Sequence, residues 1–213
     1  MYNYNSIKKL ACEVEWSFMS DVYVEKSWNI IREELKGLVL DIGSRDGVVT
    51  WRHKNSIGVD IEPAPVCFIP TIKGRAENLP FKDRVFDTIV MNHVLEHFEN
   101  PSEILKEVHR VLKDGGKLIV CVPNKDSYTS IIKGRKYSYV YNIQHKFYFN
   151  LPVLRAQIIT ANFEIQCVRG TVLLASFFYK IFKKFKFLRK LYMITGDLDK
   201  KHAKDLIVIA RKI

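Results

Sequence analysis

The sequence predicts a single doubly wound α/β sheet of about seven strands, with helices on both faces and one antiparallel edge strand. Its 213 residues are enough for one α/β domain and little more. Short, nearly continuous apolar runs, typical of parallel strands buried on both faces, alternate with segments of helical periodicity. A pair of strands near the end of the chain indicates that one edge of the sheet is antiparallel.

The predicted strands follow one another along most of the chain. The first is expected at residues 38–42, an almost wholly apolar run that a turn at residues 43–47 ends. The second is expected at residues 57–60, and prolines follow it closely. Further strands are predicted at residues 72–73, 85–91, 117–122, 164–168 and 206–211.

Helices are predicted between and before these strands. Asn100 and Pro101 open a helix, with Asn as the cap and Pro at the first helical position. Apolar residues recur at helical spacing after them, and the pair Gly115 and Gly116 is expected to end this helix. Residues 152–160 form another predicted helix, and the region before Gly37 is expected to be helical as well.

Composition excludes several classes of protein. Hydrophobic residues make up 47% of the chain and charged residues 27%, which is an ordinary globular balance. No run of 18 apolar residues predicts a membrane span, and the first residues lack the apolar core of a signal peptide. The four cysteines lie far apart without a CxxC pair, which argues against a zinc ribbon or a disulfide scaffold. We therefore expect a cytoplasmic protein with reduced thiols.

A glycine turn with acidic neighbours is the sharpest local feature. Asp41, Gly43 and Gly47 form the pattern D-x-G-x-x-x-G directly after the first predicted strand, where nucleotides bind in such sheets. Arg45 breaks the G-x-G-x-x-G spacing of a dinucleotide turn. The acid before the first glycine repels a pyrophosphate but attracts a cation, and Asp60 ends the second strand, where it can accept bonds from a ribose. A ribose with a cationic group describes S-adenosylmethionine; the alternative is an ordinary tight turn.

These residues stand in a longer pattern that resembles the class I S-adenosylmethionine-dependent methyltransferases, with their Rossmann-like fold. The chain is most similar to the methyltransferase type 11 group, which includes enzymes of ubiquinone and menaquinone biosynthesis. Each motif is weak alone, but their order and spacing agree over about residues 37–124. The matching stretches are residues 39–47, 57–60, 74–81, 85–87, 94–97, 107–116 and 117–124.

The resemblance implies a role for particular residues. The backbone around Gly43 and the side chain of Asp41 would face the methionine part of the cofactor, and Asp60 would hold the ribose beside Ile61 at the adenine. Asn92 and His93 would lie below the sulfonium. The predicted cofactor-binding residues are Asp41, Gly43, Ser44, Gly47, Asp60, Ile61, Ala76, Glu77 and Asn92.

The chain departs from the family pattern in three places. Arg45 replaces a glycine, and we expect its side chain to point outward from the turn. Arg75 replaces an acid that often precedes the Ala-Glu pair, which removes one acceptor for the adenine amino group. The short interval between Gly47 and Gly58 predicts a first helix of one or two turns only.

The resemblance also sets the domain organisation. We expect one methyltransferase domain over residues 1–213. It would consist of an N-terminal helical cap at residues 1–36, a cofactor-binding core at residues 37–124, and a substrate-side part at residues 125–213 with a loop, a basic helix and the last strands.

Two histidines are candidate general bases, because the pKa of histidine lies near neutrality. His93 follows the fourth strand at the mouth of the expected site, and His145 lies in the loop region after the fifth strand. For both residues a purely structural role is the alternative. His97 is expected to cap or pack a helix, and Glu96 to serve in a turn. No set of histidines and acids has metal-ligand spacing along the sequence, so no metal is predicted.

Basic charge is concentrated at the end of the chain. The net charge is +11, and residues 180–213 carry eleven Lys or Arg against three Asp. Residues 172–193 read as a basic amphipathic helix, which would either pack on the sheet or contact the inner face of a membrane. Residues 125–146 are basic and rich in tyrosine, as in a lid over a flat or lipidic acceptor.

Three functions follow from these observations. The first is a methyltransferase for a small-molecule or lipid- or sugar-linked acceptor, which the family resemblance and the aromatic lid favour. The second is an RNA methyltransferase, which only the basic charge favours. The third is a non-catalytic methyltransferase-fold partner with weakened cofactor binding, as Arg45 and Arg75 suggest. The sequence does not indicate the oligomeric state.

Overall fold

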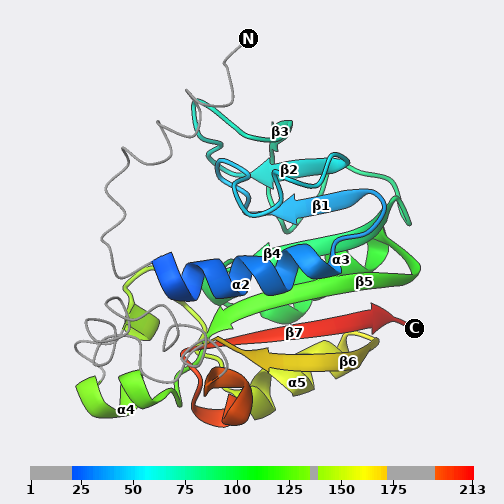
Figure 1. Cartoon of the computed structure of the whole chain (residues 1–213). Helices are drawn as coiled ribbons and strands as arrows, with labels where there is room; N and C mark the ends of the chain where they lie inside the picture. Colours follow the sequence, from blue (N-terminus) through cyan, green and yellow to red (C-terminus); the bar gives the residue numbers. More distant parts are fainter. Residues whose placement is uncertain (1–20, 135–138, 172–194) are drawn as a thin grey trace.

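A seven-stranded mixed sheet forms the centre of the molecule, with the strand order β3-β2-β1-β4-β5-β7-β6 (Figure 1). The computed structural model describes residues 21–134, 139–171 and 195–213. The strands are β1 (Val39–Ile42), β2 (Ser56–Asp60), β3 (Thr71–Lys73), β4 (Phe86–Asn92), β5 (Leu112–Pro123), β6 (Phe163–Gly170) and β7 (Asp205–Lys212).

The first five strands run parallel, and β7 alone runs against its neighbours β5 and β6. Parallel pairing requires long connections, whereas antiparallel neighbours can follow each other more directly. β2 lies on one side of β1, and β4, which comes later in the chain, lies on the other side. The predicted fold class, with its antiparallel strand near one edge, is therefore confirmed.

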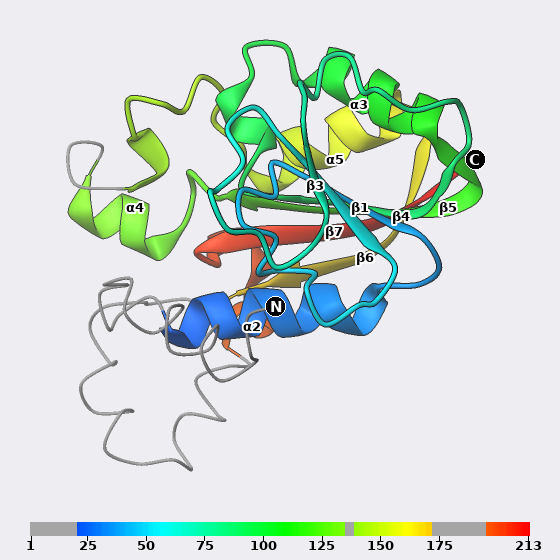
Figure 2. The ribbon, with the colours of Figure 1, turned by 90° about the horizontal axis from the view of Figure 1, so that it is seen from above.

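Helices cover both faces of this sheet, α2 one face and α3 with α5 the other (Figure 2). Alternate residues of each strand feed two separate cores, as the pleat requires. Val39, Val90 and Ile119 pack with Ile30 and Ile31 of α2, whereas the larger core on the opposite face includes Leu40, Ile89 and Leu105. The helical segments are α2 (Asp21–Glu34), η1 (Leu95–His97), α3 (Pro101–Val111), α4 (Tyr128–Lys133), η3 (Tyr139–Tyr141), α5 (Leu151–Thr160) and η4 (Lys200–His202).

Two predictions about helices are wrong. Gly115 and Gly116 do not end a helix: α3 ends at Val111, and both glycines lie inside β5. The cause is long-range pairing, because Leu112 already pairs with Phe86 of β4, across an irregularity in the register. The short helix expected after Gly47 is also absent from the described chain, since residues 48–55 form only turns before β2 begins.

A buried lysine joins α2 to the far end of the sheet. Lys26 is only 5% exposed, and its Nζ donates hydrogen bonds to the carbonyl oxygens of Gly170 and Thr171 at 2.7 and 2.6 Å. The same ammonium lies 3.1 Å from Oδ2 of Asp197. Burial lowers the pKa of Lys26, while the ion pair with Asp197 acts against this. Residues on both sides of the interval 172–194 are thus held by one side chain.

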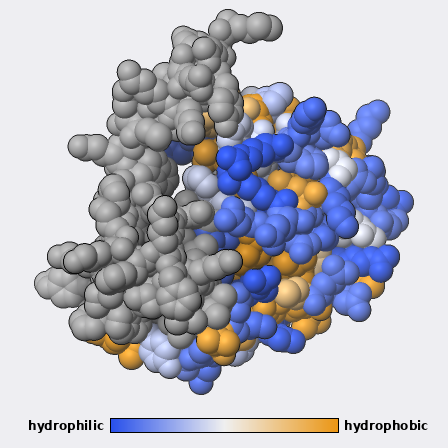
Figure 3. Space-filling view, in the orientation of Figure 1, coloured by the Kyte–Doolittle hydropathy of each residue, from blue (hydrophilic) through white to orange (hydrophobic). Residues whose placement is uncertain are grey.

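Some predicted segments lie outside the described residues. They are the basic amphipathic stretch at residues 172–193, the first 20 residues of the N-terminal cap, and residues 135–138 of the tyrosine-rich loop. Figure 3 shows the face of the molecule that Figure 1 presents, with polar residues over much of the described surface and smaller groups of apolar residues between them. None of the described helices combines the length and the apolar character that a bilayer span requires.

Candidate functional site

Several of the predicted cofactor residues lie at the ends of β1, β2 and β4, where the order of the strands in the sheet reverses. β1 lies between β2 and β4, and its register pairs Asp41 with Gly58 of one neighbour and Val90 of the other. Asp60 and Asn92 are the last residues of β2 and β4. The carboxyl ends of parallel strands on either side of such a reversal form the usual ligand crevice of α/β sheets.

The turn after β1 is held by the residues packed against it. Gly43 has a φ of +67°, and its amide donates to the carbonyl of Val59 at 2.7 Å. A Cβ at this position would lie 2.3 Å from Cγ2 of Val94, so a side chain is excluded by Val94 itself. We expected Gly43 to admit a ligand to the backbone; the structure adds a packing reason. A Cβ at Gly47 would likewise meet Ile69 at 2.4 Å.

Asp60 is fixed by two backbone amides. Its Oδ2 accepts a hydrogen bond from the amide of Arg45 at 2.7 Å, and its Oδ1 accepts one from the amide of Glu62 at 2.8 Å. Each carboxylate oxygen has further lone pairs, which remain available to hydroxyl donors. Arg45 has a φ of +51° and an exposed side chain, as expected from the sequence. The Arg45 amide therefore orients Asp60 although the side chain of Arg45 points away.

The residues predicted to surround the adenine differ in exposure. Ile61 is 55% exposed directly after Asp60, so an apolar side chain stands free beside the carboxylate. Ala76 is buried, whereas Glu77 is exposed and forms an ion pair of 2.6 Å with Arg75. Arg75, which replaces the family's acid, thus binds the neighbouring acid. An exposed pair of this kind contributes little to stability.

Asp41 is buried at the end of β1. Its side chain accepts a hydrogen bond from the Thr50 hydroxyl at 2.8 Å. The pKa of Asp41 is raised to about 7, chiefly by burial and to a smaller extent by the nearby acids Asp46 and Asp60, while the bond from Thr50 acts in the opposite direction. A cationic ligand nearby would stabilise the ionised carboxylate, as the methionine ammonium of the predicted cofactor would.

Two of the predicted residues carry buried polar atoms without a hydrogen-bond partner in the described chain. These atoms are Oγ of Ser44 and Oδ1 of Asn92. Ser44 packs over Gly58, since a Cβ on that glycine would lie 2.3 Å from Oγ. Asn92 ends β4 beside the glycine turn. An orphaned buried acceptor at the carboxyl edge indicates a place for a donor from a ligand.

His93 occupies a strained position just past β4. Its φ is +56°, and Nε2 lies 3.7 Å from Sγ of Cys121 while Nδ1 lies 3.4 Å from Oε1 of Glu96. Burial opposes a charge on the ring, but Cys121, Glu96 and Asp205 raise the pKa of His93 well above 6.5. Burial also raises the pKa of the Cys121 thiol, and Glu96 is the carboxyl group closest to the ring in these contacts, at 3.4 Å.

His145 comes close to the end of β4 through backbone pairing. The amides of Lys146 and Phe147 both donate to the carbonyl of Glu96, at 2.9 and 3.0 Å. The rings of His97 and His145 then meet edge to face, with centroids 5.0 Å apart. The predicted site residues His93 and His145 are therefore brought together around Glu96.

Sequence reasoning missed Glu96 and His97. Glu96 is 1% exposed, and neither of its carboxylate oxygens accepts a hydrogen bond from any described residue. The expected turn role does not account for a buried carboxylate without donors. The close spacing of His93, Glu96 and His97 just after a predicted strand was the available signal, and the structure places Glu96 and His97 in η1 and His93 before it.

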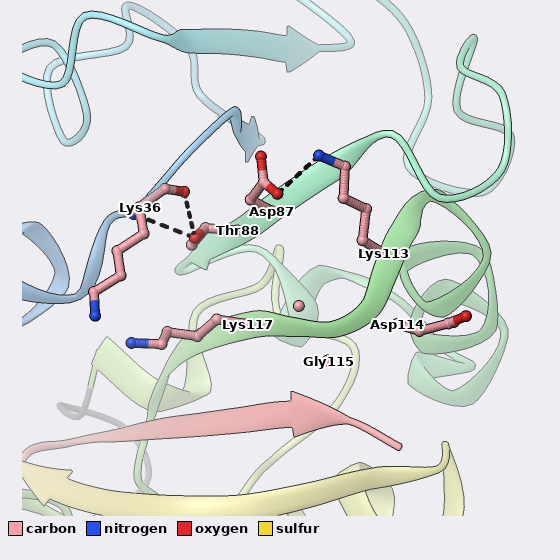
Figure 4. Close-up of a pocket in the computed structure, with 8 residues that line it drawn as sticks. Lys36, Asp87, Thr88, Lys113, Asp114, Gly115 and Lys117 are labelled. Atoms are coloured by element: carbon pink, nitrogen blue, oxygen red, sulfur yellow. Dashed lines mark hydrogen bonds and ion pairs between the residues drawn. The ribbon is translucent and has the colours of Figure 1, made fainter.

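A hollow of about 260 Å³ lies at the opposite edge of the sheet, at the amino ends of β4 and β5 (Figure 4). Lys36 and Thr88 bond to each other on one side of it, and Lys113 pairs with Asp87 at 2.8 Å on the other. Apart from Lys36, the charged side chains that line it form ion pairs with other described residues. The hollow is separated from Asp41, Asp60 and Asn92 by the length of the strands, so it is not part of the candidate site.

Comparison with known proteins agrees with this geometry. Residues 40–120 match the family model of a methyltransferase domain. An uncharacterised protein of Methanocaldococcus jannaschii is 42% identical over 98 residues, which are 44% of this chain and 48% of that protein. The demethylmenaquinone methyltransferase of Streptomyces griseus is 32% identical over 62 residues, 29% of this chain and 27% of that enzyme. These alignments span about half or less of the curated relatives.

Solved structures are similar over nearly the whole chain. An S-adenosylmethionine-dependent methyltransferase from Thermotoga maritima superposes with a TM-score of 0.70 and 23% identity, covering 92% of this chain and 91% of that one. One from Archaeoglobus fulgidus gives a TM-score of 0.61 and 20% identity, covering 91% and 94%. At such identities these likenesses concern the fold.

The fold and the crevice define the class I methyltransferase architecture. Within that class, the match at residues 40–120 confirms the resemblance to the methyltransferase type 11 group. The residues of the crevice fit S-adenosylmethionine, because they offer a fixed carboxylate, an exposed apolar side chain and a buried acid suited to a cation.

Proposed function

We propose that this protein transfers a methyl group from S-adenosylmethionine to a small-molecule or lipid- or sugar-linked acceptor. The geometry of Asp60 carries the proposal. Two backbone amides hold its carboxylate at the end of β2, and the exposed Ile61 follows it. This pairing suits a ribose diol with an adjacent purine. A carboxylate that served only the turn would not require an exposed apolar neighbour.

The other residues of the crevice would hold the rest of the cofactor. Burial raises the pKa of Asp41 to about 7, so a cationic group at the methionine end would favour its ionised form, and Asn92 supplies the unpartnered acceptor Oδ1. S-adenosylmethionine supplies an electrophilic methyl group when it is bound. The chain contributes alignment of the acceptor with that group, which in favourable cases lowers the barrier by about 7–11 kcal/mol. Methyl transfer of this kind needs no dedicated base.

The two predicted bases differ in what their ring nitrogens face. Both nitrogens of His93 face protein groups, Cys121 on one side and Glu96 on the other. His145 uses Nδ1 with the carbonyl of Val140 at 2.9 Å, which leaves Nε2 for another partner. Of the two, His145 has the nitrogen that is better placed to meet an acceptor or another ligand.

The aromatic surroundings favour a flat or lipidic acceptor. Tyr141 and Tyr148 lie with ring centroids 5.0 Å apart, and Tyr148 is 39% exposed. Tyr128 stacks on His202 at 4.6 Å. An RNA acceptor is the second candidate, and the net charge of +11 is the observation in its favour. Contact of residues 172–193 with a membrane surface remains part of the proposal for a lipid-linked acceptor.

Calorimetric titration with S-adenosylmethionine and S-adenosylhomocysteine tests cofactor binding. We expect micromolar binding by the wild type and a loss of at least about tenfold in Asp60→Ala, which removes a charge-assisted hydrogen bond to the ribose. Glu164→Ala is the matched control, because Glu164 is an exposed carboxylate on the edge strand β6. Equal affinity in both variants, or no binding by the wild type, would contradict the proposal.

Transfer of a labelled methyl group identifies the acceptor class. The protein is incubated with methyl-labelled cofactor and, separately, with a lipid extract, a small-metabolite extract and total RNA. We expect label in the first or second extract. Label in RNA that disappears steeply with salt would instead support the RNA alternative. Cofactor binding without transfer to any of the three extracts would leave only the non-catalytic alternative.

A further inference from the structure

Two histidines and one buried glutamate form a cluster outside the predicted cofactor crevice. Glu96 and His97 belong to η1, and His145 comes from the segment that pairs with it. One carboxylate oxygen and one ring nitrogen of each histidine all lie within 4.8 Å of one another. The sequence predicted no metal ligands, because His145 is distant from the other two along the chain. In the folded chain, the segment that contains His145 pairs with Glu96, so the three residues lie close together.

Hydrogen bonds fix which nitrogen each histidine offers. Nδ1 of His97 lies 3.1 Å from the carbonyl oxygen of Gln144, and Nδ1 of His145 lies 2.9 Å from that of Val140. A carbonyl oxygen only accepts, so both Nδ1 atoms carry a proton, and in the neutral ring Nε2 is the nitrogen with a lone pair for a metal. Metal-bound histidines have this arrangement, in which a carbonyl holds the other ring nitrogen.

Glu96 supplies the independent observation. Its side chain is 2% exposed, yet neither oxygen receives a hydrogen bond within the described chain. The nearest cationic group is His93, whose Nδ1 lies 3.4 Å from Oε1. Burying a carboxylate without donors is unfavourable, because the charge loses its hydration. A bound cation would remove that cost, because it would occupy the side of the carboxylate that the chain leaves without a donor.

We propose that Glu96, His97 and His145 bind a divalent transition-metal ion, with zinc as the best match. Two imidazoles and one carboxylate are a known three-ligand set for zinc, which keeps a fourth position open. Metal bonds of about 2.1 Å place tetrahedral ligands about 3.4 Å apart. The three donors would therefore move together by roughly 1 Å, a shift that side-chain rotation allows. Magnesium and calcium prefer oxygen ligands and fit less well.

The site would lie at the same sheet edge as the cofactor crevice. Val94, two residues before Glu96, packs directly on Gly43 of the glycine turn. The open coordination position could then bind an oxygen of the methyl acceptor. That last step rests on the proposed function, whereas metal binding itself does not. The role given to His145 is a metal ligand, in place of the general base that the sequence suggests.

Zinc titration into the tag-free, EDTA-treated protein tests the site without any methyl transfer. We expect one saturable zinc ion per chain by calorimetry, and binding weaker by at least about tenfold in His97→Gln and His145→Gln. His53→Gln is the control, because His53 bonds to the carbonyl of Gly37 away from any carboxylate cluster. Magnesium in excess should not displace the zinc.

Cobalt provides a second readout. Co²⁺ in place of Zn²⁺ should give visible absorption typical of nitrogen and oxygen ligands, and His145→Gln should abolish it. Glu96→Gln should weaken binding as well, but the two partly exposed histidines decide the result if that variant does not fold. No saturable zinc binding at millimolar concentration, or binding unchanged in both histidine variants, would overturn the proposal. Absence of cofactor binding would leave this result intact.

Discussion

The two halves of the carboxyl edge hold their acidic groups in opposite ways. At β1 and β2, Asp41 is bonded to Thr50 and Asp60 to two backbone amides. Next to β4, Glu96 is buried with no hydrogen-bond donor from the described chain. The carboxylates of the first half are fixed by donors of the chain, so a ligand there meets acidic groups already held in place. In the second half His93 lies 3.4 Å from Glu96 without a hydrogen bond, and our proposal adds a metal ion there.

A side chain added at Gly43, in the turn after β1, should have the largest effect on the free energy of unfolding. Gly43→Ala places a Cβ 2.3 Å from Val94 at a φ of +67°. Overpacking and the left-handed backbone together should lower the free energy of unfolding by roughly 2–5 kcal/mol, measured by urea denaturation. Gly134→Ala is the control, with a φ of +70° and nothing within 4 Å. A similar loss in both variants would show that packing on Val94 is unimportant.

The buried acid of the first half should make stability depend on pH. The pKa of Asp41 is about 7 when folded and near 4 when unfolded, so folding favours the protonated acid. Its contribution to stability is therefore full below about pH 4 and is lost as the pH rises towards 7. As the pH rises over this range, the free energy of unfolding of Asp41→Asn should increase relative to that of the wild type by on the order of 3 kcal/mol.

Urea denaturation of both proteins at a series of pH values measures this difference. Asp205, whose pKa is also raised to about 7 by burial, is present in both and cancels in the comparison. Asn at position 41 can still accept the bond from Thr50. A gap between wild type and variant that stays constant from pH 4 to 8 would show that Asp41 is not protonated in the folded state.

Ligands should stabilise the two halves independently. At a hundredfold excess over its dissociation constant, each ligand adds about 2.7 kcal/mol to the free energy of unfolding. We expect S-adenosylhomocysteine to raise the melting temperature of His145→Gln more than that of Asp60→Ala. Zinc should raise the melting temperature of Asp60→Ala more than that of His145→Gln. If either variant lost both responses, the two halves would form one site rather than two.

Replacing Arg45 should have the smallest effect. Its φ of +51° is costly for any residue with a side chain, and its exposed guanidinium has no hydrogen bond or ion pair with the described residues. Arg45→Gly should therefore stabilise the protein by up to about 1 kcal/mol in the same urea assay. The amide that holds Asp60 is retained, so cofactor affinity should stay the same. A destabilised variant would mean that the Arg45 side chain supports the turn.

Local patterns predicted the fold well and the histidine cluster poorly. Buried strands such as β1 and β4 are visible as apolar runs, and the glycine turn with Asp41 and Asp60 follows from short-range spacing. The start of β5 was missed because Leu112 is recruited by pairing with Phe86, which competes with the glycine signal for a helix end. The proximity of His145 to Glu96 depends on two backbone hydrogen bonds between distant segments, and no local spacing encodes them.

The contacts of Lys26 have a consequence for how the sequence of this chain can vary. Its ammonium binds Gly170, Thr171 and Asp197 together, and a Cβ on Gly170 would lie 2.2 Å from the carbonyl of Gly196. The described residues on either side of the interval 172–194 are thus held at one junction. Doubling the length of chain between two such fixed ends costs only about 0.6 kcal/mol. A change in the length of the chain between residues 171 and 195 should therefore alter the free energy of unfolding little, as long as Lys26 is kept.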